Sequence, residues 1–319
     1  MSLHVLHYRH EGHARWGVVR NGAITPIPGE FTTTAEFIAA NPVERLIELD
    51  GPTIPESAVQ WLSPVSANQQ FICQGANYRQ HMIESGMDPD AKKFNMLFTK
   101  ATSCIVPADS PLVKPSHVRF LDYEIELGLV LKKNITSRCT IAEGDLSEYI
   151  AGAVIVNDYS ARDIQIPQMQ FYKGKSFRTF GPIGPYLCLL ERADMAMLGQ
   201  LELTLTVNGS IRQQDSTANL VYGPAETLTE ISGVHDLFVG DLLSTGTPAG
   251  CALSVPSPMK QRLLAAALSE EAKWKMFMDI QAARPQYLRA GDVVESRIAS
   301  RDGSIDLGVQ RNEVVDEAS

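Results

Sequence analysis

The sequence of 319 residues has only five cysteines, and nothing in their arrangement points to a disulfide framework or a zinc ribbon. Their number is odd, they are widely scattered, and no CxxC pair occurs. We therefore expect free thiols and a cytoplasmic location. The longest apolar run, from Ile150 to Val156, is far shorter than the roughly 20 residues that cross a bilayer. The N-terminus also lacks an apolar signal region, so neither membrane insertion nor export is expected.

Basic residues do not predominate either: the formal net charge is −9, whereas nucleic-acid-binding surfaces normally carry a basic excess. We therefore expect no nucleic-acid partner. A phosphate-binding GxxxxGK[ST] loop and a GxGxxG motif after a strand are both missing, which argues against a nucleotide-dependent enzyme. An acidic protein still binds a small anion when a metal ion and a few cations gather in one pocket.

What the sequence does contain is a succession of short strands and turns. Residues 1–65 are expected to form a small N-terminal lobe, with a type I′ hairpin turn at Asn21-Gly22. Residues 66–319 would form the main domain, an α+β structure of mostly antiparallel strands. Within it, residues 256–289 have a helical pattern and read as an insertion.

The sharpest chemical signal is Glu124-Ile125-Glu126, within the stretch LDYEIELGLV. Alternation along a strand places both carboxylates on one face, roughly 7 Å apart at the backbone. The other face, with Ile125 and Leu127, would pack into a core. Two like charges beside a core are costly without a counter-ion, which favours a bound cation. The alternative is a solvated edge strand with ordinary surface glutamates.

A third carboxylate, Asp158, follows the apolar run that ends at Val156. Three carboxylates with water make a hard oxygen site, suited to magnesium, manganese or calcium. Arg162 and Gln165 come four and seven residues later, and share a face with Asp158 if a helix begins directly after it. A helix cap followed by surface polar residues is the alternative.

Three further elements carry weaker signals. Lys175, in KGKSF, stands beside a glycine and can approach an anion closely. Thr247, in STGTPAG, could hold a carboxylate together with backbone N–H groups. On a helix, His81 and Glu84 are three residues apart and could pair, which would raise the basicity of the imidazole. A purely structural pair is the alternative.

The combination of DYExE, NDxSARDxQ, KGKSF and TGTPAG, in this order, resembles the fumarylacetoacetate hydrolase superfamily from Phe71 to Val314. The branch it resembles contains acylpyruvases and 2-hydroxyhepta-2,4-diene-1,7-dioate isomerases. The resemblance implies a mixed β-roll, usually assembled as a homodimer, with a divalent metal ion in the catalytic roll. Arg178-Thr179-Phe180-Gly181 departs from the Asp-Thr-Phe-Cys type of sequence found in many members.

Family roles carry over to matching positions of this chain. The resemblance implies that Glu124, Glu126 and Asp158 bind the metal, expected to be Mg²⁺, Mn²⁺ or Ca²⁺. It further implies catalytic roles for His81, Glu84 and Lys175, and substrate contacts by Arg162, Gln165, Thr247 and Tyr78.

The activity expected from this resemblance is hydrolytic carbon–carbon cleavage of a small 2,4-dioxo acid, of the acylpyruvate or fumarylpyruvate type, as in aromatic compound catabolism. The dyad of His81 and Glu84 would activate water. Two alternatives stay open. One is a decarboxylase or keto–enol isomerase that acts on an oxaloacetate-like or dienedioate oxo acid at the same metal site. The other is a non-catalytic protein that binds metal and ligand.

Overall fold

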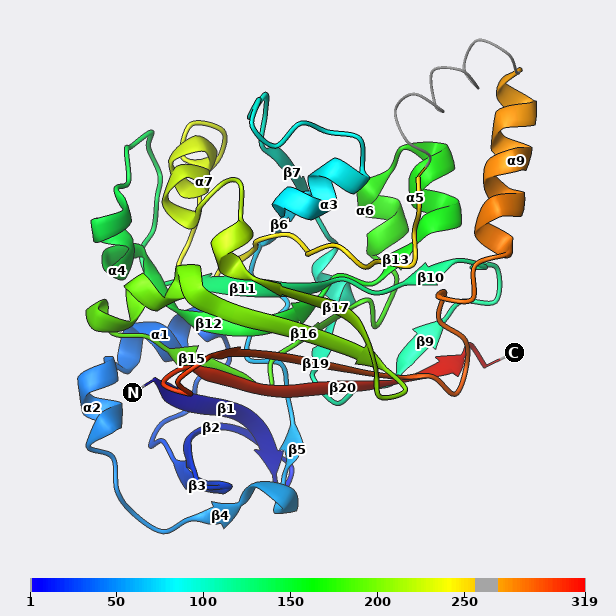
Figure 1. Ribbon diagram of the computed structural model, residues 1–319. Helices are drawn as coiled ribbons and strands as arrows, with labels where there is room; N and C mark the ends of the chain where they lie inside the picture. Colours follow the sequence, from blue (N-terminus) through cyan, green and yellow to red (C-terminus); the bar gives the residue numbers. More distant parts are fainter. Residues whose placement is uncertain (1, 256–268, 319) are drawn as a thin grey trace.

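The computed structural model describes residues 2–255 and 269–318, which form the predicted α+β structure of mainly antiparallel strands (Figure 1). A large sheet of 13 strands has β11 and β12 near its middle. Its main path runs through β4 (Ile54–Pro55), β3 (Ala23–Pro26), β2 (His13–Arg20), β1 (Leu3–His10), β15 (Tyr186–Leu189), β12 (Ile150–Asn157), β11 (Ile125–Leu131), β18 (Leu242–Ser244), β6 (Phe71–Gly75) and β7 (Met96–Thr99). Off this path lie β5 (Gln60–Trp61), β8 (Ile105–Pro107) and β14 (Gly181–Ile183).

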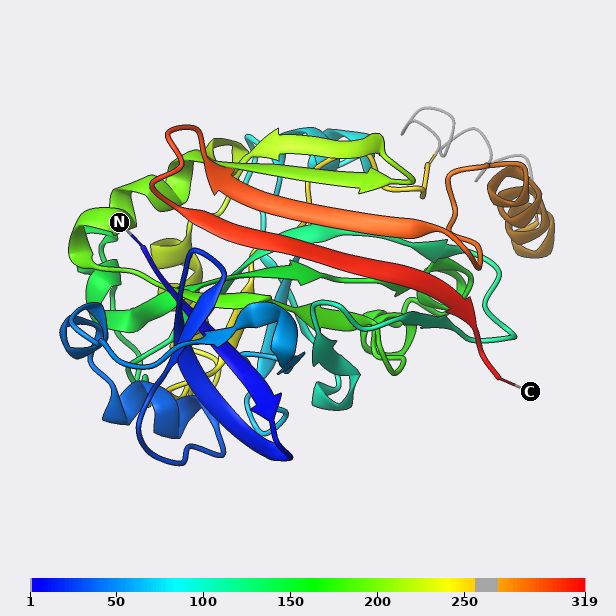
Figure 2. The same cartoon turned by 90° about the horizontal axis from the view of Figure 1, so that it is seen from below.

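A second sheet of five strands packs against the first, and Figure 2 shows its long strands crossing the molecule. Its order is β17 (Ser210–Ser216), β16 (Leu201–Val207), β19 (Val293–Ser300), β20 (Asp306–Asp316) and β9 (Leu112–Lys114). A two-stranded ladder joins β10 (Leu121–Asp122) to β13 (Ser160–Ala161). The helices with described bounds are α1 (Thr34–Ala40), α2 (Val43–Ile47), α3 (Arg79–Glu84), α4 (Leu146–Tyr149), α5 (Arg162–Gln168), α6 (Phe171–Lys175), α7 (Pro224–Ile231) and α9 (Glu270–Ala282).

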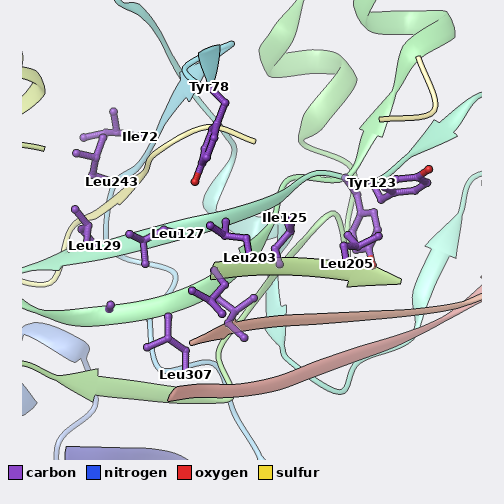
Figure 3. Close-up of a cluster of buried hydrophobic side chains, with 14 of the residues drawn as sticks. Ile72, Tyr78, Tyr123, Ile125, Leu127, Leu129, Leu203, Leu205, Leu243 and Leu307 are labelled. Carbon is purple, nitrogen blue, oxygen red and sulfur yellow. The ribbon is translucent and has the colours of Figure 1, made fainter. Parts of the chain in front are cut away.

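The main core lies between these two sheets (Figure 3). Ile125 and Leu127 of β11 are fully buried there and face Leu203 and Leu205 of β16. Strand β16 alternates buried and half-buried residues, as expected of a strand with one face on a core. Because side chains alternate along β11, Glu126 points to the opposite side of the sheet from Leu127. The core therefore fixes the direction in which the acidic side chains point.

The N-terminal segment is continuous with the large sheet, since β1 pairs with β15. The expected hairpin joins β2 to β3, and Asn21 and Gly22 have the positive φ values (52° and 74°) of a type I′ turn. The division of the chain at residue 65 stays a prediction.

Within the predicted insertion, α9 occupies Glu270–Ala282, whereas residues 283–289 are turns and irregular chain. Residues 256–268 of the prediction lie outside the described residues. The C-terminal end of α9 is tied to the segment before the insertion: Gln281 Nε2 donates to Ser254 O at 2.8 Å, and Arg284 Nε donates to Ala252 O at 2.6 Å. None of the described helices is long and apolar enough to span a membrane.

Candidate active site

Three buried carboxylates from two neighbouring strands converge on one point. Glu124 precedes β11, Glu126 lies within it, and Asp158 follows β12. The antiparallel pairing sets Ile125 opposite Asn157, and the Asp158 N–H donates to Glu124 O at 2.8 Å. One oxygen of each carboxylate lies within 4.8 Å of the others. The structure thus brings together the three residues predicted to bind metal.

Two lysines neutralise this cluster. Lys175 Nζ lies 2.5 Å from Glu124 Oε2 and 2.6 Å from Asp158 Oδ2, and donates to Ser160 Oγ at 2.8 Å. Lys100 Nζ lies 2.5 Å from the other Asp158 oxygen. Both lysine side chains are at most 3% exposed, so their charges are poorly screened by water. Sequence reasoning anticipated Lys175 and missed Lys100.

Arg162 forms a second cationic contact with the cluster. Its guanidinium donates to Glu124 Oε1 at 2.5 Å and to Asp122 Oδ2 at 2.8 Å. The third donor, Nη1, reaches Gln165 Oε1 at 2.8 Å, as expected of residues three apart on a helix. The helix itself begins at Arg162, because Ser160 and Ala161 pair with β10, so Asp158 does not share its face as we expected.

The end of β18 and the TGTPAG segment that follows it hold Glu126. Ser244 Oγ donates to Glu126 Oε2 at 2.5 Å, and the Gly246 N–H donates to the same oxygen at 3.0 Å. The Thr247 hydroxyl donates to Ile125 O at 2.9 Å and accepts from Gln213 Nε2 at 2.8 Å. The proton of this hydroxyl is therefore bound to the backbone of Ile125. Thr247 fixes the position of the TGTPAG segment and also lines the cavity described below.

The surroundings shift the pKa values of Glu124 and Glu126 in opposite directions. Burial raises the pKa of Glu124, but Arg162 and Lys175 outweigh this effect and lower it well below its usual range. Burial and the charges of Asp158 and Glu124 raise the pKa of Glu126 to about 8. Burial lowers the pKa of Lys175, yet Asp158 and Glu124 prevail and raise it above its ordinary value. Without a bound metal ion, the lysine is therefore an ammonium at neutral pH.

His81 and Glu84 both lie on α3, but only His81 faces the carboxylates. Burial lowers the pKa of His81 and favours the neutral imidazole. Glu84 is exposed and accepts a hydrogen bond from Gln80 Nε2 at 3.2 Å. Within the described part of the chain, no hydrogen bond joins Glu84 to His81. The predicted dyad is thus present on one helix without a direct contact.

The cavity above the cluster has a volume of about 230 Å³. Its polar wall contains most of the predicted site residues, and its apolar wall comes from β7, α5, α6, Met87 after α3 and Leu253 after TGTPAG. The described lining residues are Gln74, Gly75, Ala76, His81, Ser85, Met87, Met96, Phe98, Glu124, Glu126, Arg162, Gln165, Ile166, Phe171, Lys175, Thr247 and Leu253. A volume of this size suits a small acid.

Tyr78 was expected to contact the substrate, but the structure places it elsewhere. Its side chain is fully buried in the main core, together with Ile72 and Leu127, and is not among the described residues that line the cavity. Within the described residues its hydroxyl has no hydrogen-bond partner. Tyr78 occupies the turn into α3, so its packing fixes the position of His81 rather than the substrate.

Two further residues at the site escaped sequence reasoning. Asp122 stood within the quoted LDYEIE stretch and holds Arg162; it also accepts from the Ala252 and Leu253 N–H groups at 2.7 and 2.9 Å. Cys251 follows directly on TGTPAG, and its Sγ lies 3.9 Å from Glu124 Oε1. The only sequence feature that pointed to Asp122 and Cys251 was their position next to a motif. That feature does not distinguish a residue of the site from one that only packs beside it.

The donor set fits a hard divalent cation. Carboxylate oxygens are preferred ligands of Mg²⁺, Mn²⁺ and Ca²⁺, and three such groups converge in Glu124, Glu126 and Asp158. Burial and the neighbouring charges of Asp158 and Glu124 raise the pKa of Glu126, and a bound cation would offset both effects.

Comparison with known proteins agrees with this geometry. Residues 70–315 match the family model described as fumarylacetoacetate (FAA) hydrolase C-terminal. The chain is 32% identical over 223 residues to the mitochondrial oxaloacetate tautomerase Fahd2a of Rattus norvegicus, covering 69% of both chains. It is 35% identical over 198 residues to the oxaloacetate tautomerase YisK of Bacillus subtilis, covering 61% of this chain and 64% of YisK.

A solved structure of fumarylacetoacetate hydrolase from psychrophilic Exiguobacterium antarcticum superposes with a TM-score of 0.74 at 27% identity, covering 99% of this chain and 100% of that one. The family match spans the strands and helices that carry the carboxylates, the lysines and Arg162. The chain therefore belongs to the fumarylacetoacetate hydrolase superfamily.

Proposed function

We propose that this protein is a divalent-metal-dependent enzyme that interconverts the keto and enol forms of a small, oxaloacetate-like 2-oxo acid. The observation that carries the proposal is the position of His81. Its half-buried imidazole faces Glu124 and Glu126 across a small cavity, and Asp158 lies beside these two carboxylates. Enolisation needs one group that moves a proton and a charge that stabilises the enolate. The similarity to two oxaloacetate tautomerases supports this choice.

Glu124, Glu126 and Asp158 would hold the cation, with Mg²⁺ as the first choice and Mn²⁺ or Ca²⁺ as alternatives. When bound there, a divalent cation supplies Lewis-acid polarisation of the oxo group. Arg162 and Gln165 face the same cavity and would fix the oxygen atoms of the acid.

The proton moves through His81 in this proposal. Its neutral imidazole would accept a proton from the carbon next to the oxo group and return it to the enolate oxygen, so that substrate and product differ only in the position of that proton. Lys175 remains an ammonium and would stabilise the negative oxygen without giving up its own proton.

Hydrolysis of a 2,4-dioxo acid is the second candidate, favoured by the presence of His81 on the cavity wall and by the likeness to the Exiguobacterium antarcticum hydrolase. That reaction requires His81 to take a proton from water. Contact with Glu84 would help to orient the imidazole, and this contact is missing between the described side chains of α3. The geometry therefore favours the reaction that needs no attacking water.

The test follows the enol absorbance of oxaloacetate as it approaches the keto–enol equilibrium, with Mg²⁺ and then with chelator. Free metal also speeds this reaction, so Glu126→Gln provides the matched control at equal metal concentration. Pyruvate and carbon dioxide are measured in parallel, and acylpyruvates form the second panel. Chelator-sensitive acceleration without pyruvate would support the tautomerase. Acylpyruvate cleavage with no tautomerase activity would replace it with the hydrolase, and release of carbon dioxide would indicate a decarboxylase.

A further inference from the structure

We propose that His81, Glu124 and Cys251 form a second metal site, of mixed nitrogen, oxygen and sulfur donors, that binds Zn²⁺ or another thiophilic divalent cation. A ring nitrogen of His81, a carboxylate oxygen of Glu124 and Cys251 Sγ all lie within 4.8 Å of one another. The site formed by Glu124, Glu126 and Asp158 is called the oxygen site below. The mixed site shares only Glu124 with it.

The three side chains come from separate parts of the chain that the fold fixes independently. His81 is carried by α3 on the cavity wall, and Glu124 lies directly before β11. Cys251 follows the TGTPAG segment, and the residues after it, Ala252 and Leu253, are anchored through their N–H groups to Asp122. The position of the thiol is therefore set by backbone hydrogen bonds rather than by a flexible side chain.

The thiol has only weak protein partners. Sγ lies 3.9 Å from Glu124 Oε1, 3.7 Å from Gln213 Nε2 and 4.0 Å from Pro248 O. These are long contacts for a group that is 8% exposed beside two charged or ionisable side chains. A metal ion would replace them with a short bond and release the thiol proton to solvent.

Donor chemistry separates the two sites by metal. Thiolate and imidazole ligands favour zinc over magnesium, whereas a set of carboxylates favours magnesium, manganese or calcium. Three protein ligands with further positions open to water or an anion are a common arrangement for zinc. Because Glu124 belongs to both sets, zinc at the mixed site would withdraw a ligand from the oxygen site and weaken its hold on Mg²⁺.

The experiment uses the full-length protein with Co²⁺ as a spectroscopic substitute for Zn²⁺, together with a competition titration for Zn²⁺ in excess Mg²⁺. Thiolate bound to Co²⁺ gives a charge-transfer band in the near ultraviolet, so this readout is independent of turnover and of the proposed substrate. Cys251→Ser removes the sulfur while it keeps the size and a weak donor. Cys139→Ser is the matched control, since Cys139 is the more exposed of the two cysteines.

We expect a near-ultraviolet cobalt band in the wild type and in Cys139→Ser, and its loss in Cys251→Ser. Zn²⁺ affinity should fall by about tenfold or more in Cys251→Ser, because even the loss of a group that only supports a ligand costs this much. Mg²⁺ affinity measured without zinc should stay unchanged. A cobalt band that survives Cys251→Ser, or zinc that binds equally well to both variants, would overturn the proposal. Loss of the band in Cys139→Ser would do the same.

Discussion

Asp122 Oδ2 accepts a hydrogen bond from Arg162 Nε at 2.8 Å, and both side chains are at most 3% exposed. The same carboxylate accepts from two backbone N–H groups, those of Ala252 and Leu253. Asp122 thereby connects the arginine that faces the cavity with the segment that carries Cys251. It acts as a positioning residue, because it is not among the described residues that line the cavity.

We predict that Asp122→Asn destabilises the protein by about 3 kcal/mol, because it leaves a buried guanidinium with one carboxylate partner in place of two. Activity should fall about 10- to 100-fold, as Arg162 loses its fixed orientation. Chemical denaturation and steady-state kinetics measure the two effects. Asp145→Asn, at an exposed position without a side-chain partner among the described residues, serves as the control and should leave both unchanged. Equal behaviour of the two variants would contradict the positioning role.

Binding of the cation to the oxygen site should release a proton. Glu126 has a pKa of about 8 without metal, so it is mostly protonated at pH 7, whereas a metal ligand must be a carboxylate. Proton and metal therefore compete, and Mg²⁺ affinity should weaken about tenfold per pH unit below pH 8 and level off above it. Calorimetry in two buffers of different ionisation enthalpy measures the proton count. Glu126→Gln should bind metal weakly and release none; wild-type protein that released no proton would refute the assignment.

Much of the fold was predictable because local signals agreed with tertiary packing. Asn21-Gly22 forms the expected turn, and Ile125 and Leu127 pack into the core as alternation required. The start of α5 was predicted wrongly, since Ser160 and Ala161 first pair with β10. That pairing joins segments about 40 residues apart, and a local pattern carries no information about it.

At the site, the carboxylates were predictable because burial of like charges demands a counter-ion. Lys100 was not, because a lysine that follows a strand looks like an ordinary surface residue until the fold sets it beside Asp158. The family resemblance implied that Tyr78 contacts the substrate, yet the turn into α3 directs its ring into the core. Sequence proximity to a motif predicts neighbourhood but not the direction of a side chain.

Variants of α3 distinguish the proposed reaction from hydrolysis. His81→Ala should reduce keto–enol interconversion by about 10²- to 10⁴-fold, the usual contribution of a general acid or base. Glu84→Gln should change it by no more than about twofold, because Glu84 is exposed and acts on His81 only as a neighbour three residues away. Initial rates for both variants at saturating metal are compared with the wild type. If Glu84→Gln were as damaging as His81→Ala, a working dyad, and with it hydrolysis, would become the better interpretation.

Gly246 offers a test of how the backbone holds the metal site. Its φ is +89°, its N–H donates to Glu126 Oε2 at 3.0 Å, and an added Cβ would lie 2.9 Å from Asn77 Cβ. Gly246→Ala should therefore cost about 1–2 kcal/mol in left-handed backbone strain and also displace the donor, lowering Mg²⁺ affinity by about tenfold. Gly209→Ala is the matched control, because Gly209 has a similar φ of +75° in a hairpin turn with nothing within 4 Å of the added Cβ.

Gly246→Ala and Gly209→Ala share the backbone strain, but only Gly246 donates a hydrogen bond to Glu126. Their comparison therefore isolates the effect of displacing this donor on Mg²⁺ binding. Thermal unfolding without metal should show losses of stability in both, with the larger loss in Gly246→Ala because of its clash with Asn77. Only Gly246→Ala should also lose part of the stabilisation that added Mg²⁺ provides, since the stabilisation by a ligand grows with the logarithm of its affinity for the folded state. If Mg²⁺ raised the unfolding temperature of both variants equally, the Gly246 N–H would not be holding Glu126 in the geometry that binds the ion.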